Sequence, residues 1–517
     1  MKYRESQTDK ELRTWFVNDF SKLLLRKISL RKGTLRGINS LDLAIDYPIT
    51  AIAGANGAGK STILAMACCA YHNTPKGFKL PRRKTTYYTF SDFFVQHAQE
   101  LAPQGIEIRY YIAHNKWKPN PELPNGVGIG WQRKWKAKGG KWNNYADRVR
   151  RNVAFLGIER IVPHSERSQS RSYSRSFKDV PQKGWESKVK DAVGYILGKK
   201  YDDFRYLEHT KYSLPLVQVD GVTYSGFNMG AGENALFEIF SNMYSAGEGA
   251  LLVMDEIELG LHARAQRRFM VKLKEACKET RTQILCTTHS KEIFESLPDD
   301  ARFFVESVAG KTKITPGMSA EFAFAKMGNT TPPSLFIFTE DEVARAVLQS
   351  VLPASIRSRV EICVIGSASA LARQLAASFL RKEKTATLAI FDGDQKTKHK
   401  DNSNHAAKMA EVGVKEFSTW FDARSIYLPG STWPEAWMIQ KCKDIPNEVA
   451  ECLNANKNDI SEIMEYALQA GKHKEFHELS SAIGLPKDQC LDRICGVIAR
   501  SFSAEFDDIR EKVLGLL

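Results

Sequence analysis

The stretch GANGAGKS, residues 54–61, decides the first half of the fold. It follows the apolar run ITAIA, which is typical of a buried strand, and it precedes TILAMACC, which is typical of a helix. Its spacing matches the pattern G-x-x-x-x-G-K-[ST], in which glycines let backbone N–H groups turn toward phosphate oxygens. The sequence therefore predicts a nucleotide-phosphate site at a strand-to-helix turn.

The side chains of this loop have separate expected roles. We expect Lys60 to reach the β- and γ-phosphates of ATP, and the Ser61 hydroxyl to bind Mg²⁺. The helix N-terminus adds partial positive charge beneath the phosphates. The predicted nucleotide contacts are Gly54, Asn56, Gly57, Ala58, Gly59, Lys60, Ser61 and Thr62.

Three further motifs follow the loop along the chain. NMGAGE, residues 228–233, opens a helical segment and is called here the signature loop. ALLVMDEIE is a strand that ends in Asp255, expected to hold Mg²⁺, and Glu256, expected to activate the attacking water. The strand QILCTT ends just before His289, from which an imidazole can contact the γ-phosphate.

The order of these motifs resembles that of ABC-type ATPases, over about residues 20–306. In that family the signature loop of one protomer caps the ATP held by the other, so the resemblance implies a homo-oligomer with ATP between protomers. Gly230, Gly232 and Glu233 would then contact the partner's ATP. Gly230 stands where serine is usual and Glu233 where glutamine is usual, as in non-transporter ABC ATPases that handle DNA.

A glutamine that would sense the γ-phosphate is not apparent in the sequence. FSDFF, residues 90–94, offers Ser91 or Asp92 for that purpose. A short helix that begins with a serine cap explains the same residues equally well.

The second half of the chain alternates strands with helices, which predicts a parallel α/β sheet. Acids follow two of its strands: Glu340 after LFIFT, and Asp392 and Asp394 after TLAIF. Open α/β sheets place their sites at such strand ends. The expected organisation is an ATPase domain at 1–310, a linker at 311–333, an acidic α/β domain at 334–445 and a helical region at 446–517.

This arrangement of acids is similar to the Toprim domain of topoisomerases, primases and OLD-family nucleases. Clustered carboxylates of this kind bind Mg²⁺, which can polarise a phosphodiester. The resemblance implies that Glu340, Asp392 and Asp394 are metal ligands. Glu435 is a candidate for a further catalytic acid, and a loop glutamate after Pro434 at a helix start is the alternative. The resemblance also implies a catalytic lysine, for which Lys396, Lys398, Lys441 and Lys443 are alternatives.

An ABC-type ATPase followed by a Toprim domain is the OLD-family architecture. That resemblance implies a prokaryotic ATP-regulated DNA nuclease that serves in defence against phage. The alternative is an ATP-driven sensor or scaffold with a silent Toprim domain. Such a protein recruits a separate nuclease effector, such as the HNH subunit of Septu-type systems or of systems with a retron component.

Residues 116–178 are basic and aromatic, and we expect them to form an insertion into the ATPase domain. Between 131 and 151 they hold eight Lys or Arg against one Asp, interleaved with Trp131, Trp135 and Trp142. Cations neutralise phosphates and aromatic rings stack on unpaired bases, so this segment predicts a nucleic-acid contact. Tryptophans that pack back onto the core are the alternative.

Three features of the sequence predict a cytoplasmic protein. No apolar run is long enough for a bilayer, the N-terminus lacks a secretory signal, and the nine cysteines lack metal-ligand spacing. We therefore expect no membrane partner. The formal net charge of +14 favours polyanionic partners.

Overall fold

The computed structural model divides into two units, Tyr3–Met318 and Ser319–Leu517. It describes residues 3–73, 76–80, 83–94, 97, 99–100, 103–138, 142–143, 148–162, 176–209, 213–308, 311–328, 333–381, 385–410 and 414–517. No helix among them is both long enough and apolar enough to cross a membrane.

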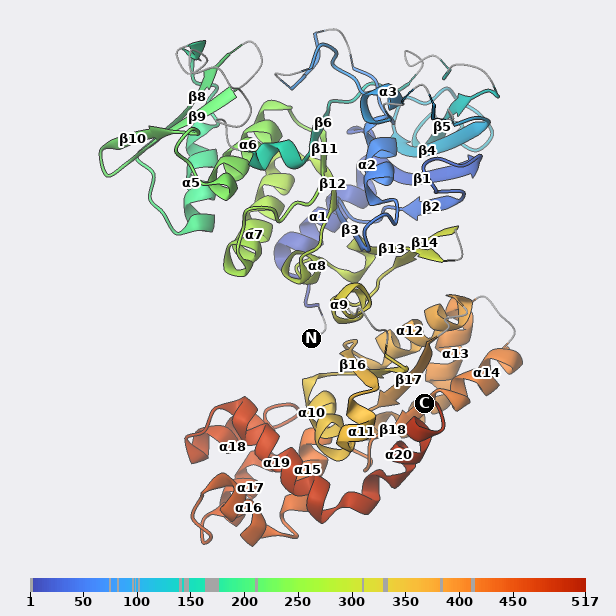
Figure 1. The fold of residues 1–517 in the computed structure, drawn as a ribbon, viewed down its shortest axis with the longest axis vertical. Coiled ribbons are helices and arrows are strands. Elements are labelled where there is room, and N and C mark those ends of the chain that lie inside the picture. Colours follow the sequence, from blue (N-terminus) through green and yellow to red (C-terminus); the bar gives the residue numbers. More distant parts are fainter. Residues whose placement is uncertain are drawn as a thin grey trace. The chain divides into compact units, whose positions relative to one another are not determined.

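A six-stranded sheet forms the centre of the first unit (Figure 1). Its strands, in spatial order, are β14 (Lys311–Pro316), β13 (Arg302–Val308), β3 (Ile49–Gly54), β12 (Gln283–Thr287), β11 (Leu251–Met254) and β6 (Val153–Leu156). All neighbours are parallel except β14, which runs antiparallel to β13. Every residue of β3, β11 and β12 is buried, as expected for parallel strands covered on both faces.

An antiparallel sheet adjoins this centre, and it corrects the predicted insertion at 116–178. Its strands, in spatial order, are β2 (Leu41–Ala44), β1 (Leu24–Lys32), β4 (Ile106–His114) and β5 (Gly128–Lys136). Because β5 and β6 are strands of the two main sheets, the segment is not a simple excursion. Buried and exposed residues alternate along β5, but the sequence does not show this because basic residues lie on both faces. Lys134, for example, points inward and is 1% exposed.

Helices and a small third sheet complete the first unit. The helices are α1 (Gln7–Asn18), α2 (Lys60–Cys68), α3 (Phe90–Phe93), α5 (Glu186–Leu197), α6 (Ala231–Ser245), α7 (Ala263–Thr280) and α8 (Lys291–Glu295). The third sheet has the order β10 (Val222–Ser225), β9 (Ser213–Val219), β8 (Asp203–Glu208) and β7 (Lys178–Asp179). Figure 1 shows α5, α6 and α7 next to one another, between this sheet and the central one.

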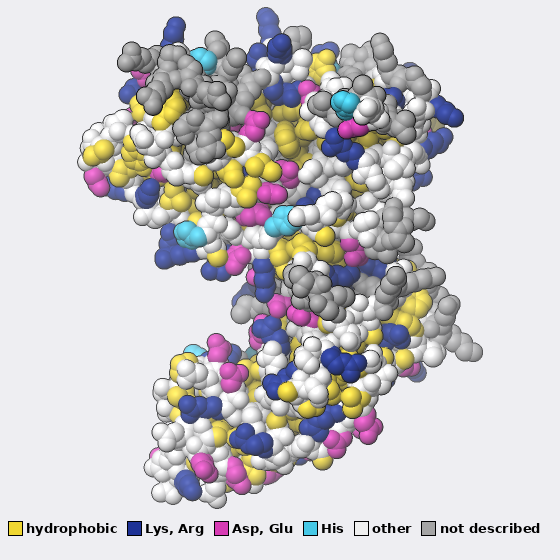
Figure 2. All heavy atoms as spheres, in the orientation of Figure 1, with side chains coloured by type: hydrophobic (Ala, Val, Ile, Leu, Met, Phe, Trp, Pro, Cys, Tyr) yellow, Lys and Arg dark blue, Asp and Glu magenta, His cyan; other side chains and the backbone are white. Residues whose placement is uncertain are grey.

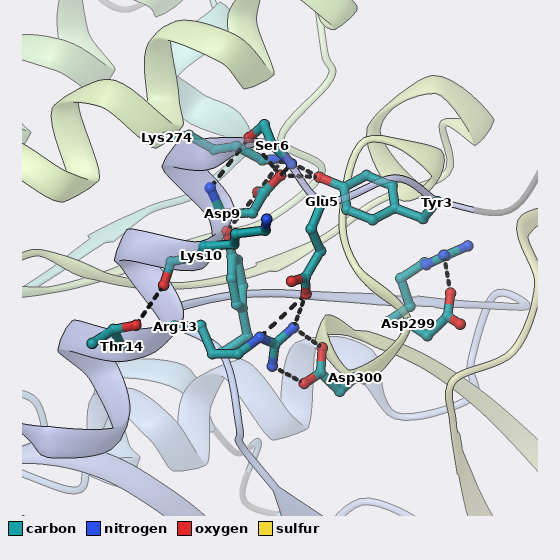
Figure 3. Close-up of polar contacts among 12 residues, drawn as sticks. Tyr3, Glu5, Ser6, Asp9, Lys10, Arg13, Thr14, Lys274, Asp299 and Asp300 are labelled. Carbon is teal, nitrogen blue, oxygen red and sulfur yellow. Dashed lines mark hydrogen bonds and ion pairs between the residues drawn. The ribbon is translucent and has the colours of Figure 1, made fainter.

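A buried ion pair fixes α1 to α7 (Figure 3). Asp9 is 1% exposed and lies 2.8 Å from the ammonium group of Lys274. Tyr3 and Tyr47 also donate hydrogen bonds to the Asp9 carboxylate, at 2.7 and 2.8 Å. Burial by itself would raise the pKa of Asp9, but the hydrogen bond and charge of Lys274 outweigh it and hold that pKa far below its usual range.

Replacing Asp9 by asparagine is expected to lower the free energy of unfolding of the first unit by about 3–5 kcal/mol, because Lys274 stays buried without its counter-ion. The folded-state pKa of Asp9 is depressed, so its contribution is present above about pH 4 and is lost as the pH falls further. Urea unfolding at pH 7 and pH 3 measures both effects. Glu11→Gln, which removes a surface pair with Lys278, is the control and should change little.

The second unit contains a parallel four-stranded sheet, as its alternating sequence predicts. The spatial order is β16 (Val360–Val364), β15 (Leu335–Thr339), β17 (Ala386–Phe391) and β18 (Ser425–Tyr427). Helices α10 (Glu342–Val351) and α12 (Ala368–Arg381) connect the first three strands. The three-residue strand β18 was not predicted, because it is too short to show a periodic pattern.

Two predicted boundaries of this half need correction. The expected linker 311–333 contains β14, which belongs to the sheet of the first unit, and α9 (Ala320–Gly328), which belongs to the second. The helical region from 446 onward is not separate either. Its helices share one apolar core with the sheet residues Leu335, Ile337 and Leu388.

The remaining helices of the second unit are α11 (Ala354–Arg357), α13 (His399–Met409), α14 (Val414–Ala423), α15 (Pro434–Cys442), α16 (Pro446–Leu453), α17 (Ile460–Gln469), α18 (Glu475–Ile483), α19 (Lys487–Ser501) and α20 (Asp507–Leu514). Side chains of α15 to α20 cover one face of the sheet. On the other face, Phe322 of α9 packs edge-on against Phe336 and Phe338, with ring centroids 5.0 Å apart in both pairs.

Candidate ATP site and acidic site

The predicted phosphate loop lies between β3 and α2, with the backbone that its glycines allow. Gly57 and Gly59 have φ of 77° and 100°, in the left-handed region. At Gly54, an added Cβ would lie 2.1 Å from the carbonyl oxygen of Val305. The loop therefore requires glycine at these positions.

The ammonium group of Lys60 lies inside the loop. It donates hydrogen bonds to the carbonyl oxygens of Gly54 at 2.7 Å and Ala55 at 3.1 Å, and the residue is 8% exposed. Burial lowers the pKa of Lys60, while the negative charges of Asp255 and Glu256 oppose that shift. A buried cation held next to backbone N–H groups suits the binding of phosphate.

The structure brings the predicted magnesium ligands together. Ser61 Oγ lies 3.3 Å from Asp255 Oδ2, and the Thr287 hydroxyl donates to the other oxygen of the same carboxylate. Ser61 comes from the start of α2, Asp255 follows β11, and Thr287 ends β12. One hydroxyl and one carboxylate at adjacent strand ends are hard oxygen ligands of the kind that Mg²⁺ prefers.

Glu256 and His289 lie just beyond the ends of the neighbouring strands β11 and β12. Glu256 adopts φ of 49°, which is unusual for a residue with a side chain, and its N–H donates to the Thr287 hydroxyl at 2.8 Å. His289 is exposed, just beyond the end of β12. Glu258, which was not predicted, accepts hydrogen bonds from the Thr288 hydroxyl at 2.8 Å and from the N–H of His289. It thereby fixes the turn that carries His289.

Arg160 is a second residue that the sequence did not reveal. It is 1% exposed, and its guanidinium donates to the carbonyl oxygens of Asp255 at 2.7 Å and of Glu256. Burial lowers its pKa, and nearby acids oppose that change. The arginine therefore holds the backbone of the two acids, from a segment almost a hundred residues earlier in the chain.

The signature loop places its two glycines in different surroundings. Gly230 is the N-cap of α6 with φ of −61°, and an added Cβ there would meet nothing within 4 Å. At Gly232 an added Cβ would lie 2.1 Å from the carbonyl oxygen of Gly260. Gly232 is therefore needed for packing within the protomer, whereas Gly230 is free to face a partner.

Glu233 differs from the prediction that it contacts the partner's nucleotide. Its side chain is 7% exposed and accepts hydrogen bonds from the Tyr201 hydroxyl and, at 2.8 Å, from the Tyr224 hydroxyl. Lys199 lies 3.2 Å from the same carboxylate oxygen. The carboxylate thus joins α6 to the neighbouring strands, and the signature loop offers its backbone rather than this side chain.

Substitution at Gly230 is the cleanest test of the signature loop. Gly230→Asp should fold, because aspartate is a good N-cap for α6. Its carboxylate should nevertheless repel the γ-phosphate held by a second protomer, so we expect ATP hydrolysis to fall by about 100-fold or more while ATP binding persists. Gly230→Ser caps the helix equally well, restores the usual hydroxyl and should hydrolyse ATP normally. Equal activity of the two variants would contradict this role for the loop.

FSDFF forms a short helix, as the alternative interpretation expected, but the helix is capped by Thr89 and not by a serine. The Asp92 carboxylate accepts hydrogen bonds from the N–H of Thr89 at 2.6 Å and from its hydroxyl at 3.0 Å, forming a capping box. Arg83 lies 3.2 Å from the same carboxylate. Ser91 remains exposed at the start of the same short helix.

In the second unit, the predicted acids meet at the ends of β15 and β17. Glu340 Oε1 accepts a hydrogen bond of 3.2 Å from the N–H of Asp392. Asp392 is 5% exposed, and its Oδ1 has no hydrogen-bond partner. Burial, with the charge of Glu340 next in importance, raises the pKa of Asp392 to about 9, and burial also raises the pKa of Glu340. A buried carboxylate oxygen without a donor suits a divalent cation.

Glu435 belongs to the same cluster, at the first turn of α15. It is 3% exposed, and burial raises its pKa. Its Oε1 lies 3.0 Å from Nδ1 of His473, and its charge acts on Asp392. Among the described residues, the structure therefore brings Glu340, Asp392 and Glu435 into one acidic cluster.

Lys472, which was not among the four alternatives, lies next to one of the predicted acids. Its ammonium group lies 3.1 Å from Asp394 Oδ2. Lys441 pairs with Glu505 and Lys443 with Glu465, while Lys396 and Lys398 are exposed. Lys472 lies in the helical region that was expected to stand apart from the acids, so no motif pointed to it.

Residues 137–295 match the sequence profile of a family described as an AAA domain and associated with an AbiEii-type toxin of a type IV toxin–antitoxin system. The chain carries an AAA-type ATPase domain. The match covers the signature loop, Asp255, Glu256 and His289. Together with the phosphate loop at residues 54–61, the match supports an ATPase in the first unit.

Solved structures similar to this chain include three SMC head domains. That from Thermotoga maritima is 16% identical and covers 56% of this chain and 98% of its own, with a TM-score of 0.35. An SMC head bound to the C-terminal winged-helix domain of ScpA is 14% identical, covers 56% and 97%, and has a TM-score of 0.38. One derived from Pyrococcus furiosus, bound to the C-terminal domain of ScpA, is 12% identical, covers 58% and 97%, and has a TM-score of 0.36. None of the curated proteins matches this chain.

Proposed function

We propose that this chain is an ATP-regulated, Mg²⁺-dependent DNA nuclease. The observation that carries the proposal is the cluster of Glu340, Asp392 and Glu435, with an unpartnered and buried oxygen on Asp392. The acids follow neighbouring parallel strands in the order that resembles a Toprim domain. An ABC-type ATPase ahead of such a domain supports an OLD-type protein that acts in prokaryotic defence against phage.

The acidic cluster offers carboxylates of the kind that support phosphodiester cleavage with Mg²⁺. Glu340, Asp392 and Asp394 would hold Mg²⁺, and the ion would polarise the phosphodiester and stabilise the leaving oxygen. Lys472, beside Asp394, would add positive charge where the phosphate binds.

The ATP site would control the acidic cluster of the second unit through assembly of two protomers. Lys60 would hold the β- and γ-phosphates, Ser61 and Asp255 would hold Mg²⁺, and Glu256 would orient the attacking water. The open Gly230 would face the γ-phosphate bound by the partner. ATP would thus join two protomers and hydrolysis would release them.

A second candidate function is an ATP-driven sensor or scaffold whose acidic cluster does not catalyse cleavage. The ion pair of Lys472 with Asp394, and the raised pKa of Asp392, favour it, because an ammonium group and a bound proton can replace a metal ion. Such a protein would act through a separate nuclease effector, such as an HNH subunit or a retron component.

Incubation of the purified protein with supercoiled plasmid separates the two functions. The nuclease should nick or linearise DNA in Mg²⁺ or Mn²⁺, with a rate that changes when ATP is added. The scaffold should leave every DNA substrate intact in both metals until its partner is supplied.

One face of β5 supports DNA as the polyanionic partner. Trp131 and Trp135 are 45% and 38% exposed, and Arg133 lies between them on the same face. The Arg109 guanidinium lies 4.6 Å from the Trp131 ring centroid. Figure 2 shows Lys and Arg side chains along the edge of the first unit where Figure 1 places this sheet. Trp142 instead stacks on Phe90, with ring centroids 4.2 Å apart, as the alternative interpretation expected.

Trp131→Ala should weaken binding of single-stranded DNA by about 5- to 100-fold, because stacking contributes about 1–3 kcal/mol per base. Fluorescence anisotropy with a labelled oligonucleotide measures the change. Ile129→Ala is the matched control, since Ile129 is 50% exposed on the same face and cannot stack. Equal losses in both variants would argue against stacking on this face.

A further inference from the structure

The C-terminal helices bring one imidazole to the acidic cluster. His473 lies between α17 and α18, and its Nδ1 is 3.0 Å from Glu435 Oε1. Asp341, which follows Glu340, completes a group of three side chains. One potential ligand atom from each of Asp341, Glu435 and His473 lies within 4.8 Å of the other two.

This spacing is close to that of atoms sharing one metal ion. Nitrogen and oxygen ligands bind first-row ions such as Zn²⁺ at about 2.0–2.2 Å, so two ligands of one ion are at most about 4.4 Å apart. Side-chain shifts of a few tenths of an ångström would therefore bring all three atoms to an ion. The Glu435 and His473 atoms, which are 3.0 Å apart, are already within that limit.

Two of the ligands are prepared by their surroundings. Asp341 caps α10, since its Oδ1 accepts a hydrogen bond of 2.9 Å from the N–H of Ala344. That bond orients the carboxylate and leaves Oδ2 available. Glu435 is 3% exposed, yet its Oε2 has no hydrogen-bond partner. A buried oxygen without a donor is costly, and a cation at this position would satisfy it.

We propose that Asp341, Glu435 and His473 form a binding site for a first-row transition-metal ion. These ligands differ from Glu340, Asp392 and Asp394, which are proposed to hold Mg²⁺, although Glu435 lies in the same acidic cluster. The inference goes beyond the proposed nuclease, because the ion would bind equally in a protein whose second unit does not cut DNA.

The imidazole decides which metals fit. Mg²⁺ takes oxygen ligands and gives up water reluctantly, whereas imidazole nitrogen suits first-row transition metals. The two carboxylates compensate the charge of a divalent ion, and one of them, Glu435, is buried. The site should therefore prefer Mn²⁺, Co²⁺ or Zn²⁺ over Mg²⁺.

Titration of the full-length, nucleotide-free protein with Co²⁺ tests the site by visible absorption. Wild type should show a d–d band that persists in excess Mg²⁺ and disappears when Zn²⁺ is added. His473→Ala should weaken Co²⁺ binding by at least about 100-fold, because losses of 10- to 100-fold follow even from changes outside the ligand set. Thermal melts without metal verify that the variant is folded, which is expected because the His473 side chain is half exposed.

Two matched variants make the result specific. His477→Ala removes an exposed imidazole one turn into α18 and should retain the Co²⁺ band. Asp392→Asn should also retain it while losing Mg²⁺-dependent cleavage, so failure of this site and failure of the nuclease are told apart. A band that survives His473→Ala, or one that excess Mg²⁺ removes, would overturn the proposal.

Discussion

The Asp392→Asn protein is expected to lose Mg²⁺-dependent DNA cleavage by about a thousandfold, because a bound metal ion contributes several kcal/mol to the stabilisation of the transition state. Asparagine keeps the shape of the side chain and removes its negative charge. ATP hydrolysis should stay near the wild-type rate, since the ATP site is built entirely by the first unit. Plasmid nicking and phosphate release, measured on the same preparations, give both numbers.

Asp392→Asn should lower cleavage but raise the stability of the metal-free protein at neutral and alkaline pH. The folded-state pKa of Asp392 is raised to about 9, so its contribution to stability is full below about pH 4 and is lost as the pH rises toward 9. The asparagine side chain does not ionise, and the metal-free variant should therefore be the more stable protein at pH 7–9 but not at pH 4. Thermal melts in EDTA test this, with Asp401→Asn on the exposed side of α13 as the control. Unchanged cleavage by Asp392→Asn would show that this carboxylate holds no catalytic metal.

Glu256→Gln is expected to retain ATP and to lower its hydrolysis by about 10²- to 10⁴-fold, the usual contribution of a general base. The amide keeps the side chain's size but cannot accept a proton from water. Lys60→Ala should instead weaken ATP binding itself, because it removes the buried cation of the phosphate loop. Equilibrium binding of labelled ATP and steady-state phosphate release separate the two defects. A wild-type hydrolysis rate in Glu256→Gln would assign the base to another residue.

Much of both sites could be predicted because parallel strands end at one edge of a sheet. Asp255, Glu340 and Asp392 each follow a buried apolar run, and such runs are visible in a single sequence. The strand order then places these acids near their partners. The spacing of the glycines predicted the phosphate loop, because that pattern is also visible within a short stretch of a single sequence.

The residues that were missed depend on contacts between distant segments. Arg160 supports Asp255 and Glu256, and Lys472 and His473 reach the acids from a turn between helices. No local pattern marks such residues. Glu233 was found through its motif, but its contacts were not predicted. The hydrogen bonds from Tyr201 and Tyr224 hold its side chain inside the protomer.

The central claim is that ATP is hydrolysed at a site completed by a second protomer, and mixing two inactive variants tests it most directly. Gly230→Asp damages the signature loop, and Glu256→Gln damages the site that the other protomer's loop completes. In a mixed dimer one composite site carries both defects and the other carries none. Random pairing makes about half of the dimers mixed, so the 1:1 mixture should recover up to about a quarter of the wild-type hydrolysis rate. A mixture that stays as inactive as the separate variants would contradict hydrolysis between protomers.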